Sequence, residues 1–288
     1  MKLKGIEKWN EKLPTYQGRR ILLIPALFII LLILGSSFTI LLYISPSFFP
    51  ESDLLYLLEP FLPFIGPLIQ ISIGLFLVSK VWSKRNTLLE QSREYAYQRG
   101  FTLGIFGIPL IITTAIHNYI PTEVLLLWQP LNPTTSVLYS SLLTVVPGWS
   151  AYELIIRIVL GLIFLMLGVL TILRAFFTFG IDYMAVVYLY YPEESELQNH
   201  QIYSVLRHPT YFGVILTAFG SCCMKFSVYS IFSFILVVVG MLFHINFVEE
   251  KELLERFGDS YRNYRKQTPA LLIKPNQIGL FLKFIFNR

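Results

Sequence analysis

Long apolar stretches alternate with short polar ones along this chain, and the pattern predicts a bundle of membrane-spanning helices. Six stretches have the apolar character of a span: residues 21–44, 61–82, 101–120, 152–177, 210–224 and 226–247. A helix needs about 20 apolar residues to cross the hydrocarbon core, so the fifth stretch is short for the task. Only Lys225 separates the last two stretches, which therefore form a hairpin. We expect an all-α integral membrane protein with about six transmembrane helices.

The stretch from Pro121 to Ser150 does not fit this pattern. It is apolar, but Pro130, Pro133 and Pro147 interrupt it, and proline breaks or kinks a helix. We expect an outer loop that lies in the membrane interface, with a broken or re-entrant span as the alternative. The chain then divides into an N-terminal membrane region of about three spans, a second membrane region and an amphipathic C-terminal tail: residues 1–150, 151–273 and 274–288.

Composition and charge support the membrane class and suggest an orientation. Only 14% of the residues are charged and 55% are hydrophobic, whereas soluble domains carry about 25% charged residues. Six spans place both termini on one side, and all but two of the 23 Lys and Arg residues share that side, the exceptions being Arg157 and Lys225. Cytoplasmic loops carry the excess of basic residues, so we expect both termini in the cytoplasm and no nucleic-acid partner. Cys222 and Cys223 are adjacent, which indicates no metal site.

Two polar clusters flank the hairpin and carry the candidate chemistry. The first covers residues 203–213 and the second covers residues 249–264. The hairpin returns the chain to the same membrane face, so both clusters should contribute to one pocket. Pro209 suits the first position of a helix. Arg207 and His208 would then lie at a helix N-terminus, where an anionic group is favoured.

Each cluster also has a purely structural interpretation. Arg207 and the neighbouring tyrosines could anchor the chain at the membrane interface, where basic and aromatic residues are common. Glu249 and Glu250 could form the acidic first turn of an exposed helix, which the helix dipole favours. Only the pairing of the two clusters across the hairpin favours a functional pocket over these alternatives.

Two charged pairs receive structural interpretations, and one further arginine is left with two. Glu252 and Arg256 have the i, i+4 spacing of a solvated helix face, so we assign no chemistry to them. Glu153 and Arg157 have the same spacing within the fourth span and are expected to neutralise each other. Arg174, near the cytoplasmic end of that span, could extend to lipid headgroups or face the pocket.

Together the two clusters resemble the isoprenylcysteine carboxyl methyltransferase family and its phospholipid methyltransferase-like relatives. The first motif reads Arg-His-Pro-x-Tyr-x-Gly over residues 207–213. The second reads Glu-Glu-x-x-Leu-x-x-x-Phe-Gly-x-x-Tyr-x-x-Tyr over residues 249–264. The resemblance covers about Tyr188 to Pro269, and the order of the motifs across an apolar hairpin makes it fairly specific. It implies a membrane methyltransferase that uses S-adenosyl-L-methionine.

The resemblance also implies which residues hold this cofactor. Carried over by position, they are Leu197, Gln198, Tyr203, Arg207, His208, Pro209, Thr210, Tyr211, Glu249 and Glu250. Candidates on the substrate side are Arg174, His244 and Asn246. The chain departs from the family at three places: the usual His-x-Leu-Val is Ser195–Gln198, a usual glycine is Gln201, and a substrate-linked arginine is Ile245. The cofactor half therefore matches better than the substrate half.

We expect methyl transfer from S-adenosyl-L-methionine to a lipophilic acceptor at the cytoplasmic face. The acceptor would be a prenylcysteine carboxylate or a related lipid, as a lipophilic small molecule or as part of a prenylated substrate. It would enter the pocket from membrane lipid. One alternative is an NADPH-dependent reductase of the sterol or steroid type, because such proteins share a similar Arg-His-Pro-x-Tyr-x-Gly hairpin. Another is a non-catalytic lipid-binding membrane protein. The sequence indicates neither a catalytic residue nor an oligomeric state.

Overall fold

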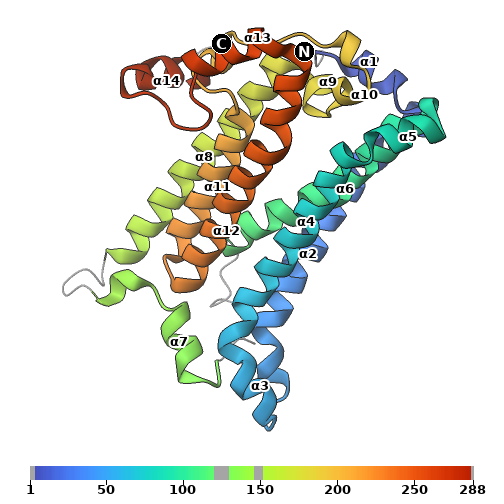
Figure 1. Ribbon diagram of the computed structural model, residues 1–288. Helices are drawn as coiled ribbons and strands as arrows, with labels where there is room; N and C mark the ends of the chain where they lie inside the picture. Colours follow the sequence, from blue (N-terminus) through green and yellow to red (C-terminus); the bar gives the residue numbers. More distant parts are fainter. Residues whose placement is uncertain (1–3, 120–129, 146–151, 287–288) are drawn as a thin grey trace.

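The computed structural model describes residues 4–119, 130–145 and 152–286, and the regular structure within these ranges is helical throughout (Figure 1). Five helical segments are long and apolar enough to cross a membrane: Gly18–Phe48, Asp53–Ser83, Arg93–Tyr119, Glu153–Phe179 and Val228–Gln267. The protein is thus an all-α, multi-pass integral membrane protein, as the hydrophobic pattern predicts. The division into three regions remains a prediction.

The longer helices form two groups of three (Figure 1). The first group is α2 (Leu23–Phe48), α4 (Leu62–Ser83) and α6 (Arg93–Ile116), and the second is α8 (Glu153–Phe179), α11 (Pro209–Lys225) and α12 (Val228–His244). The groups meet where α12 packs on α4 and α11 packs on α6. Ile71, Ala115 and Val237 are buried in this contact. The first group therefore supplies one wall of any space that lies between the two helix groups.

Shorter helices occupy the ends of the bundle. At the end that holds both chain termini lie α1 (Ile6–Glu11), α5 (Arg85–Gln91), α9 (Ile181–Met184), α10 (Val187–Tyr190), α13 (Glu250–Gln267) and α14 (Ile278–Phe286) (Figure 1). At the opposite end lie α3 (Asp53–Leu58) and α7 (Pro133–Tyr139). Both termini are thus on one side of the bundle, as an even number of crossings requires.

The expected hairpin is present, but its first arm is shorter than the other spans. α11 has 17 residues, about 25 Å at 1.5 Å per residue. It ends at Lys225, and the next residue, Phe226, adopts a left-handed φ of 47°. Ser227 then caps α12, because its side chain accepts a hydrogen bond from the Ser230 amide at 3.3 Å. The turn between the arms is therefore encoded locally, in the two residues after Lys225.

Paired glycines let α11 lie against α8 with their backbones in contact. A Cβ atom on Gly213 would lie 2.8 Å from the Gly168 carbonyl oxygen, and one on Gly168 would lie 2.7 Å from the Gly213 carbonyl oxygen. Two turns further along, Gly220 meets Gly161 in the same way. Small residues are the usual means of close helix packing in membranes. The glycine that closes the first motif thus has a packing role.

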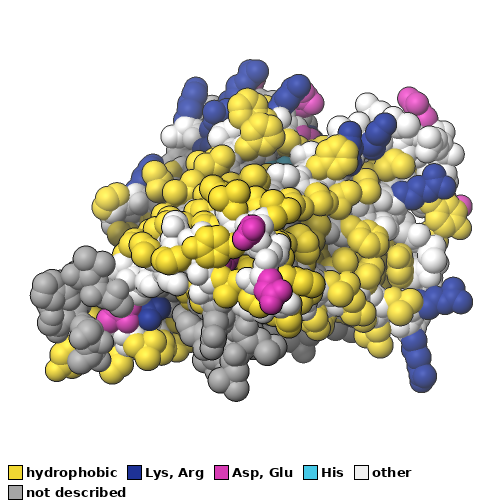
Figure 2. All heavy atoms as spheres, turned by 90° about the horizontal axis from the view of Figure 1, so that it is seen from below, with side chains coloured by type: hydrophobic (Ala, Val, Ile, Leu, Met, Phe, Trp, Pro, Cys, Tyr) yellow, Lys and Arg dark blue, Asp and Glu magenta, His cyan; other side chains and the backbone are white. Residues whose placement is uncertain are grey.

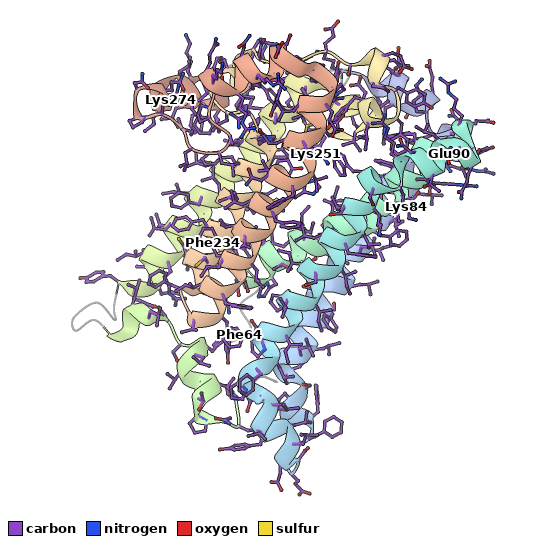
Figure 3. The ribbon with its side chains drawn as sticks, viewed as in Figure 1. Phe64, Lys84, Glu90, Phe234, Lys251 and Lys274 are labelled. Carbon is purple, nitrogen blue, oxygen red and sulfur yellow. The ribbon has the colours of Figure 1, made fainter. Side chains whose placement is uncertain are left out.

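The surface follows the same division between lipid and water. Ile33 on α2 and Ile155 on α8 are 59% and 60% exposed, which suits contact with lipid chains. Lys84, Glu90, Lys251 and Lys274 lie at the end that holds the termini, whereas the region around Phe64 and Phe234 is apolar (Figure 3). Seen from the opposite end, the molecule presents mainly hydrophobic side chains, with basic ones near the margin (Figure 2). The charge asymmetry of the sequence is therefore also a spatial one.

The region between α6 and α8 is only partly described. α7 has seven residues, about 10 Å at 1.5 Å per residue, which is too short to cross a bilayer. Residues 120–129 and 146–151 lie outside the described residues, so the choice between an outer loop and a broken span remains a prediction. Glu153 and Arg157 form the expected pair at 2.7 Å. Arg157 also donates to the Met224 carbonyl at 2.7 Å, which caps the end of α11.

The N-terminal helix α1 packs onto the segment before the first motif. The indole Nε1 of Trp9 donates to the Tyr97 hydroxyl at 2.8 Å, and that hydroxyl donates to the Ala185 carbonyl at 3.0 Å. Lys12 forms an ion pair with Glu194 at 3.0 Å, and Lys8 joins it at 2.9 Å. The basic N-terminal stretch therefore holds α9, α10 and the loop after them in place.

Candidate functional site

The hairpin brings the two polar clusters together at the end of the bundle that holds the termini. Nη2 of Arg207 lies 3.0 Å from Oε1 of Glu250, and Nε2 of His208 lies 2.8 Å from the same oxygen. Arg207 precedes α11 and Glu250 follows α12, so the apolar arms of the hairpin impose this meeting. The hypothesis that distant polar clusters join across the hairpin is confirmed.

Glu250 is the centre of a buried network rather than a wall of the pocket. Its Oε1 atom accepts hydrogen bonds from Arg207 Nε at 3.1 Å, His208 Nε2 at 2.8 Å and the Tyr261 hydroxyl at 2.7 Å, and the residue is 4% exposed. Arg207 Nη1 donates to the carbonyls of Thr268 and Arg265 at 2.6 and 3.0 Å. The guanidinium is therefore used within the protein, where it joins the first motif to α13 and to the chain after it.

The charges around His208 favour its protonated form. Burial alone would lower the pKa of the imidazole, but the carboxylates of Glu249 and Glu250 outweigh that effect and raise it to about 9. Nδ1 of His208 lies 3.7 Å from Glu249, so the ring bridges both carboxylates. At neutral pH an imidazolium and a guanidinium thus balance two adjacent glutamates.

The second motif owes its shape to one glycine. Gly258 has φ 53° and ψ −125°, a combination that side chains oppose, and it interrupts the regular geometry of α13. Beyond this kink the Tyr261 hydroxyl reaches Glu250, and the Tyr264 hydroxyl donates to the Tyr203 carbonyl at 2.6 Å. The tyrosines of the second motif therefore close the network around the first.

A wide helical turn orients the residues between α12 and α13. Residues Ile245–Glu249 form a π-helical turn, labelled η9, in which hydrogen bonds run from i to i+5. Residues about five apart then share a face, so Glu249 lies on the same side as His244. Both line one cavity, together with Met241. A regular α-helix would place the side chains of His244 and Glu249 on different faces.

This cavity has a volume of about 480 Å3 and lies between the two helix groups. Polar groups from the loops and from α13 line it at the end that holds the termini: Glu196, Gln198, Arg207, His208, Glu249 and Arg256. The membrane-spanning helices contribute an apolar lining that includes Phe28, Leu75, Val78, Ile108, Ile111 and Ile112. A small ligand site typically has such a volume and a few polar groups in an apolar wall.

Several polar atoms in the cavity wall have no hydrogen-bond partner among the described residues. They are Gln198 Oε1, Glu249 Oε2, both ring nitrogens of His244, and Nε and Nη1 of Arg256. An unpaired buried polar group is costly, so a set of them that lines one cavity points to a ligand or to water. The set includes a negative group, the Glu249 carboxylate, and a positive one, the Arg256 guanidinium.

Most of the residues expected to hold the cofactor line this cavity. They are Leu197, Gln198, Tyr203, Arg207, His208, Pro209, Thr210, Tyr211 and Glu249, whereas Glu250 is not among the lining residues. Of the three expected on the substrate side, only His244 lines the cavity. Arg174 donates to the Ile285 carbonyl on α14 at 2.9 Å, and Asn246 donates to the Leu242 carbonyl at 2.9 Å.

Arg256 was missed by the sequence reasoning. The interpretation of Glu252 and Arg256 as a solvated pair is wrong, because the Arg256 side chain is 9% exposed and lies over the Tyr188 ring at 3.9 Å. It keeps its contact with Glu252 at 3.1 Å. The spacing predicted the pair, but not that α13 lays this face against α10. No signal in the sequence distinguishes a solvated i, i+4 pair from a buried one.

Two departures from the family pattern acquire a physical meaning. Gln201, which replaces a usual glycine, has a left-handed φ of 52°, and such a conformation strains any residue with a side chain. Its Oε1 atom accepts from the Thr178 hydroxyl at 2.7 Å, which compensates part of the strain. Ile245, which replaces a usual arginine, is 1% exposed and is not among the residues that line the cavity.

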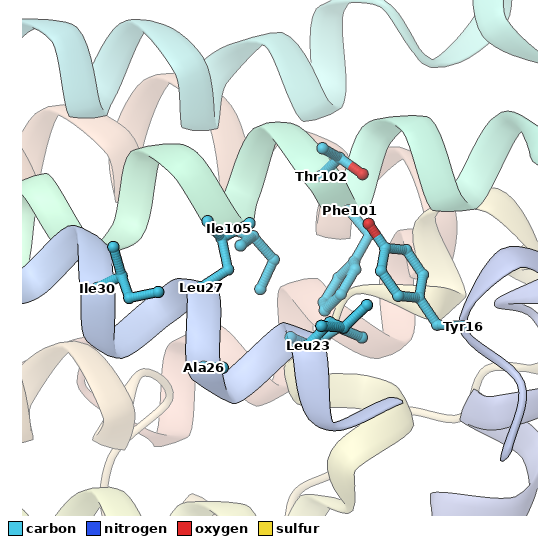
Figure 4. Close-up of a pocket in the computed structure, with 9 residues that line it drawn as sticks. Tyr16, Leu23, Ala26, Leu27, Ile30, Phe101, Thr102 and Ile105 are labelled. Atoms are coloured by element: carbon cyan, nitrogen blue, oxygen red, sulfur yellow. The ribbon is translucent and has the colours of Figure 1, made fainter. Parts of the chain in front are cut away.

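A second hollow of about 350 Å3 lies between α2 and α6 (Figure 4). Leu23, Leu27, Ile30 and Ile105 give it an apolar wall, and Tyr16 and Thr102 supply hydroxyl groups. It contains no charged group among the described residues, so we assign the chemistry to the larger cavity.

Comparisons with known proteins support the resemblance. Residues 156–260 match the family model described as phospholipid methyltransferase. A methanethiol S-methyltransferase of Pseudomonas deceptionensis is 31% identical over 83 residues, 28% of this chain and 30% of that protein. One from Crocosphaera subtropica is 26% identical over 162 residues, 50% and 62% of the two chains. The protein-S-isoprenylcysteine O-methyltransferase of Schizosaccharomyces pombe is 36% identical over 69 residues, 24% and 29%.

These matches confirm the resemblance to the isoprenylcysteine carboxyl methyltransferase family over the C-terminal part of the chain. The matched segments span less than two thirds of the length of each of these relatives. The family match runs from α8 to α13, which includes the hairpin and both polar clusters. No solved structure matches the chain.

Proposed function

We propose that this protein is an S-adenosyl-L-methionine-dependent methyltransferase that acts on a lipophilic acceptor at the cytoplasmic face of a membrane. The observation that carries the proposal is the single cavity with unpaired polar atoms at one end and an apolar wall of membrane helices. The family match and the names of the relatives support methyl transfer as the reaction. The clustering of basic residues at the polar end supports the cytoplasmic orientation.

The unpaired atoms suit the groups of the cofactor. S-adenosyl-L-methionine carries a carboxylate, an ammonium group, ribose hydroxyls and a positive sulfonium, and it supplies a methyl group that is already activated. Arg256 offers two free donors of a guanidinium, which suit a carboxylate. Glu249 offers a free carboxylate oxygen for the ammonium group or a ribose hydroxyl. Gln198 offers an amide oxygen for another donor.

The remaining lining residues hold and shield the reacting groups. The buried pair of Arg207 and Glu250 keeps the loop before α11 next to α13, so that His208 and Glu249 stay in register. The apolar wall from α2, α4 and α6 excludes water and accepts an apolar substrate from the bilayer. The protein's share of catalysis is then alignment of acceptor and donor within one water-poor space.

The test begins with cofactor binding to the purified full-length protein in detergent, measured by calorimetry. We expect binding of S-adenosyl-L-methionine that is weakened at least tenfold by Arg256→Gln, because a charge-assisted hydrogen bond contributes about 1.5–3 kcal/mol. Arg262→Gln is the matched control, since Arg262 lies on the same helix with a side chain that is 66% exposed. Equal effects of the two substitutions would contradict the assignment of Arg256.

The acceptor is then sought with methyl-labelled cofactor. Label should enter a total membrane lipid extract or a farnesylcysteine analogue, and the labelled product identifies the acceptor class. NADPH-dependent reduction of an enone lipid, with no methyl transfer, would instead favour a sterol-type reductase. Binding of lipid with neither cofactor would favour a non-catalytic lipid-binding protein.

A further inference from the structure

Residues 181–198, between α8 and the first motif, form part of the cavity wall at its polar end. They contain only short helical turns, α9, α10 and η7 (Pro192–Glu194), joined by irregular backbone. Seven residues of this loop line the cavity, among them Tyr188 and Gln198. The conformation of the 181–198 loop therefore decides whether this end of the cavity is closed.

Local geometry does not favour the conformation of this loop. Val186 has a left-handed φ of 53°, which is a genuine outlier for a β-branched residue. Gly180, just before the loop, has a φ of 100°, a conformation that glycine adopts at little cost. A strained backbone persists only where surrounding contacts hold it, and such strain is typical of ligand clamps and switch regions. Contacts from elsewhere in the chain must therefore hold the loop.

Contacts from α1 and from the turn before it hold the loop ahead of its strained residue. The Ile181 amide donates to the Lys4 carbonyl at 2.9 Å. The Tyr97 hydroxyl accepts from the Trp9 indole at 2.8 Å and donates to the Ala185 carbonyl at 3.0 Å. α1 accordingly lies beside α9 at the end that holds the termini (Figure 1). The N-terminal segment thus fixes the first part of the loop.

Ion pairs hold the loop after the strained residue. Glu194 lies 2.9 Å from Lys8 and 3.0 Å from Lys12, and the Lys12 ammonium also lies over the Tyr191 ring at 3.8 Å. The side chains of Lys8, Lys12 and Glu194 are 38%, 20% and 28% exposed. Ion pairs with this much exposure are weakened by salt and contribute little individually. They can therefore form and break readily, unlike the buried network around Glu250.

The opposite wall at the polar end is fixed. α13 supplies it, and the buried contacts of Glu250 with Arg207 and Tyr261 join α13 to the first motif. S-adenosyl-L-methionine is charged, and passage of a charged molecule through the apolar wall of membrane helices is strongly unfavourable. The cofactor must therefore pass the polar end, where the 181–198 loop is the wall that can move.

We propose that residues 4–12 are a strap that holds the 181–198 loop closed, and that the cofactor passes when this strap releases the loop. This inference rests on the proposed function, because it concerns how S-adenosyl-L-methionine reaches its site. Opening breaks the ion pairs of Glu194 and allows Val186 to leave its left-handed conformation, so relief of strain offsets part of the lost contacts. The strap lies outside residues 156–260, the segment that matches the family model, and it adds a control that the matched segment does not contain.

The first test is the dissociation rate of labelled S-adenosylhomocysteine from the full-length protein in detergent, measured by chase with unlabelled ligand. Glu194→Lys places a third cation beside Lys8 and Lys12, so we expect dissociation to become roughly tenfold faster. Lys12→Glu should act in the same direction, and the double variant should recover part of the wild-type rate because the pair forms with reversed signs. Arg262→Glu is the matched control, since Arg262 and its partner Asp259 form an exposed pair on α13, and it should leave the rate unchanged.

The wild-type protein supplies a test that needs no substitution. Raising the salt concentration from about 0.05 M to about 0.5 M screens exposed ion pairs. It should therefore speed dissociation in the wild-type protein and have a smaller effect in Glu194→Gln, which has already lost those pairs. Hydrogen exchange of the loop amides, followed by mass spectrometry, should be faster at high salt and slower with S-adenosylhomocysteine bound, whereas exchange in α11 should not depend on salt.

The outcomes separate the strap from the proposed function. Unchanged dissociation in Glu194→Lys, or loop exchange that responds neither to salt nor to ligand, would overturn the strap and leave the proposed function intact. Failure of the wild-type protein to bind S-adenosyl-L-methionine and S-adenosylhomocysteine would overturn the proposed function and this inference with it.

Discussion

The two adjacent glutamates of the second motif should give opposite results when each is replaced by glutamine. Glu250 is 4% exposed and accepts hydrogen bonds from Arg207, His208 and Tyr261 through one oxygen. Glu249 keeps a free oxygen that faces the cavity. The π-helical turn produces this difference, since it sends one carboxylate toward the network and the other toward the ligand space.

Glu250→Gln should destabilise the fold. It leaves the Arg207 guanidinium, whose side chain is 8% exposed, without its carboxylate partner. It also leaves the His208 ring, at 2%, with Glu249 as its remaining carboxylate. Removing one partner of a buried ion pair costs about 3–5 kcal/mol. At roughly 2–4 °C per kcal/mol, the Tm of the detergent-purified protein should fall by on the order of 10 °C. Glu255→Gln on the exposed side of α13 is the control and should leave Tm unchanged.

Glu249→Gln should act on binding instead. Its contact with His208, at 3.7 Å, is longer than that of Glu250, at 2.8 Å, so the Tm should fall less than in Glu250→Gln. Loss of a charge-assisted hydrogen bond to the cofactor costs about 1.5–3 kcal/mol, which weakens the affinity for S-adenosyl-L-methionine roughly 10- to 100-fold. The measurements are thermal unfolding and calorimetric titration on the same preparations. The same loss of Tm and the same affinity in both variants would refute the assignment of separate roles.

Three further predictions follow from single contacts. The raised pKa of His208 predicts that its stabilising effect is complete below about pH 6.5 and is lost as the pH rises through about 9, and His208→Gln should remove that part of the dependence of Tm on pH. Gln201→Gly and Gln201→Ala both lose the hydrogen bond to Thr178, but only glycine relieves the positive φ, so the glycine variant should be the more stable by about 1 kcal/mol in chemical denaturation. Trp9→Phe loses the hydrogen bond to Tyr97, which should cost about 1 kcal/mol and speed limited proteolysis of the N-terminal segment, whereas an unchanged digestion rate would show that α1 is held by other contacts.

The hydrophobic pattern was sufficient to predict the membrane-spanning helices and the position of both termini at one end of the bundle. Apolar length decides whether a helix crosses a membrane, and Pro209 and Ser227 mark helix starts through local geometry. The pairing of Glu153 with Arg157 also followed from spacing within one helix. The hairpin then required the two polar clusters to meet. All of these inferences use interactions between residues that are near in sequence or joined by one turn.

The tertiary structure decided which polar side chains face the cavity. Arg256 faces inward because its part of α13, which follows the π-helical turn, lies against Tyr188 of α10, and no hydrophobic period reveals that contact. Arg207 was expected to bind a ligand, yet its donors are used by Glu250 and by carbonyls near residue 268. Much of the apolar wall comes from α2, α4 and α6, which lie outside the hairpin and far before it in the sequence. The sequence by itself determined where the chain crosses the membrane, because that depends on local apolar length. The site depends on helix rotation and on packing between distant helices, which only the folded structure specifies.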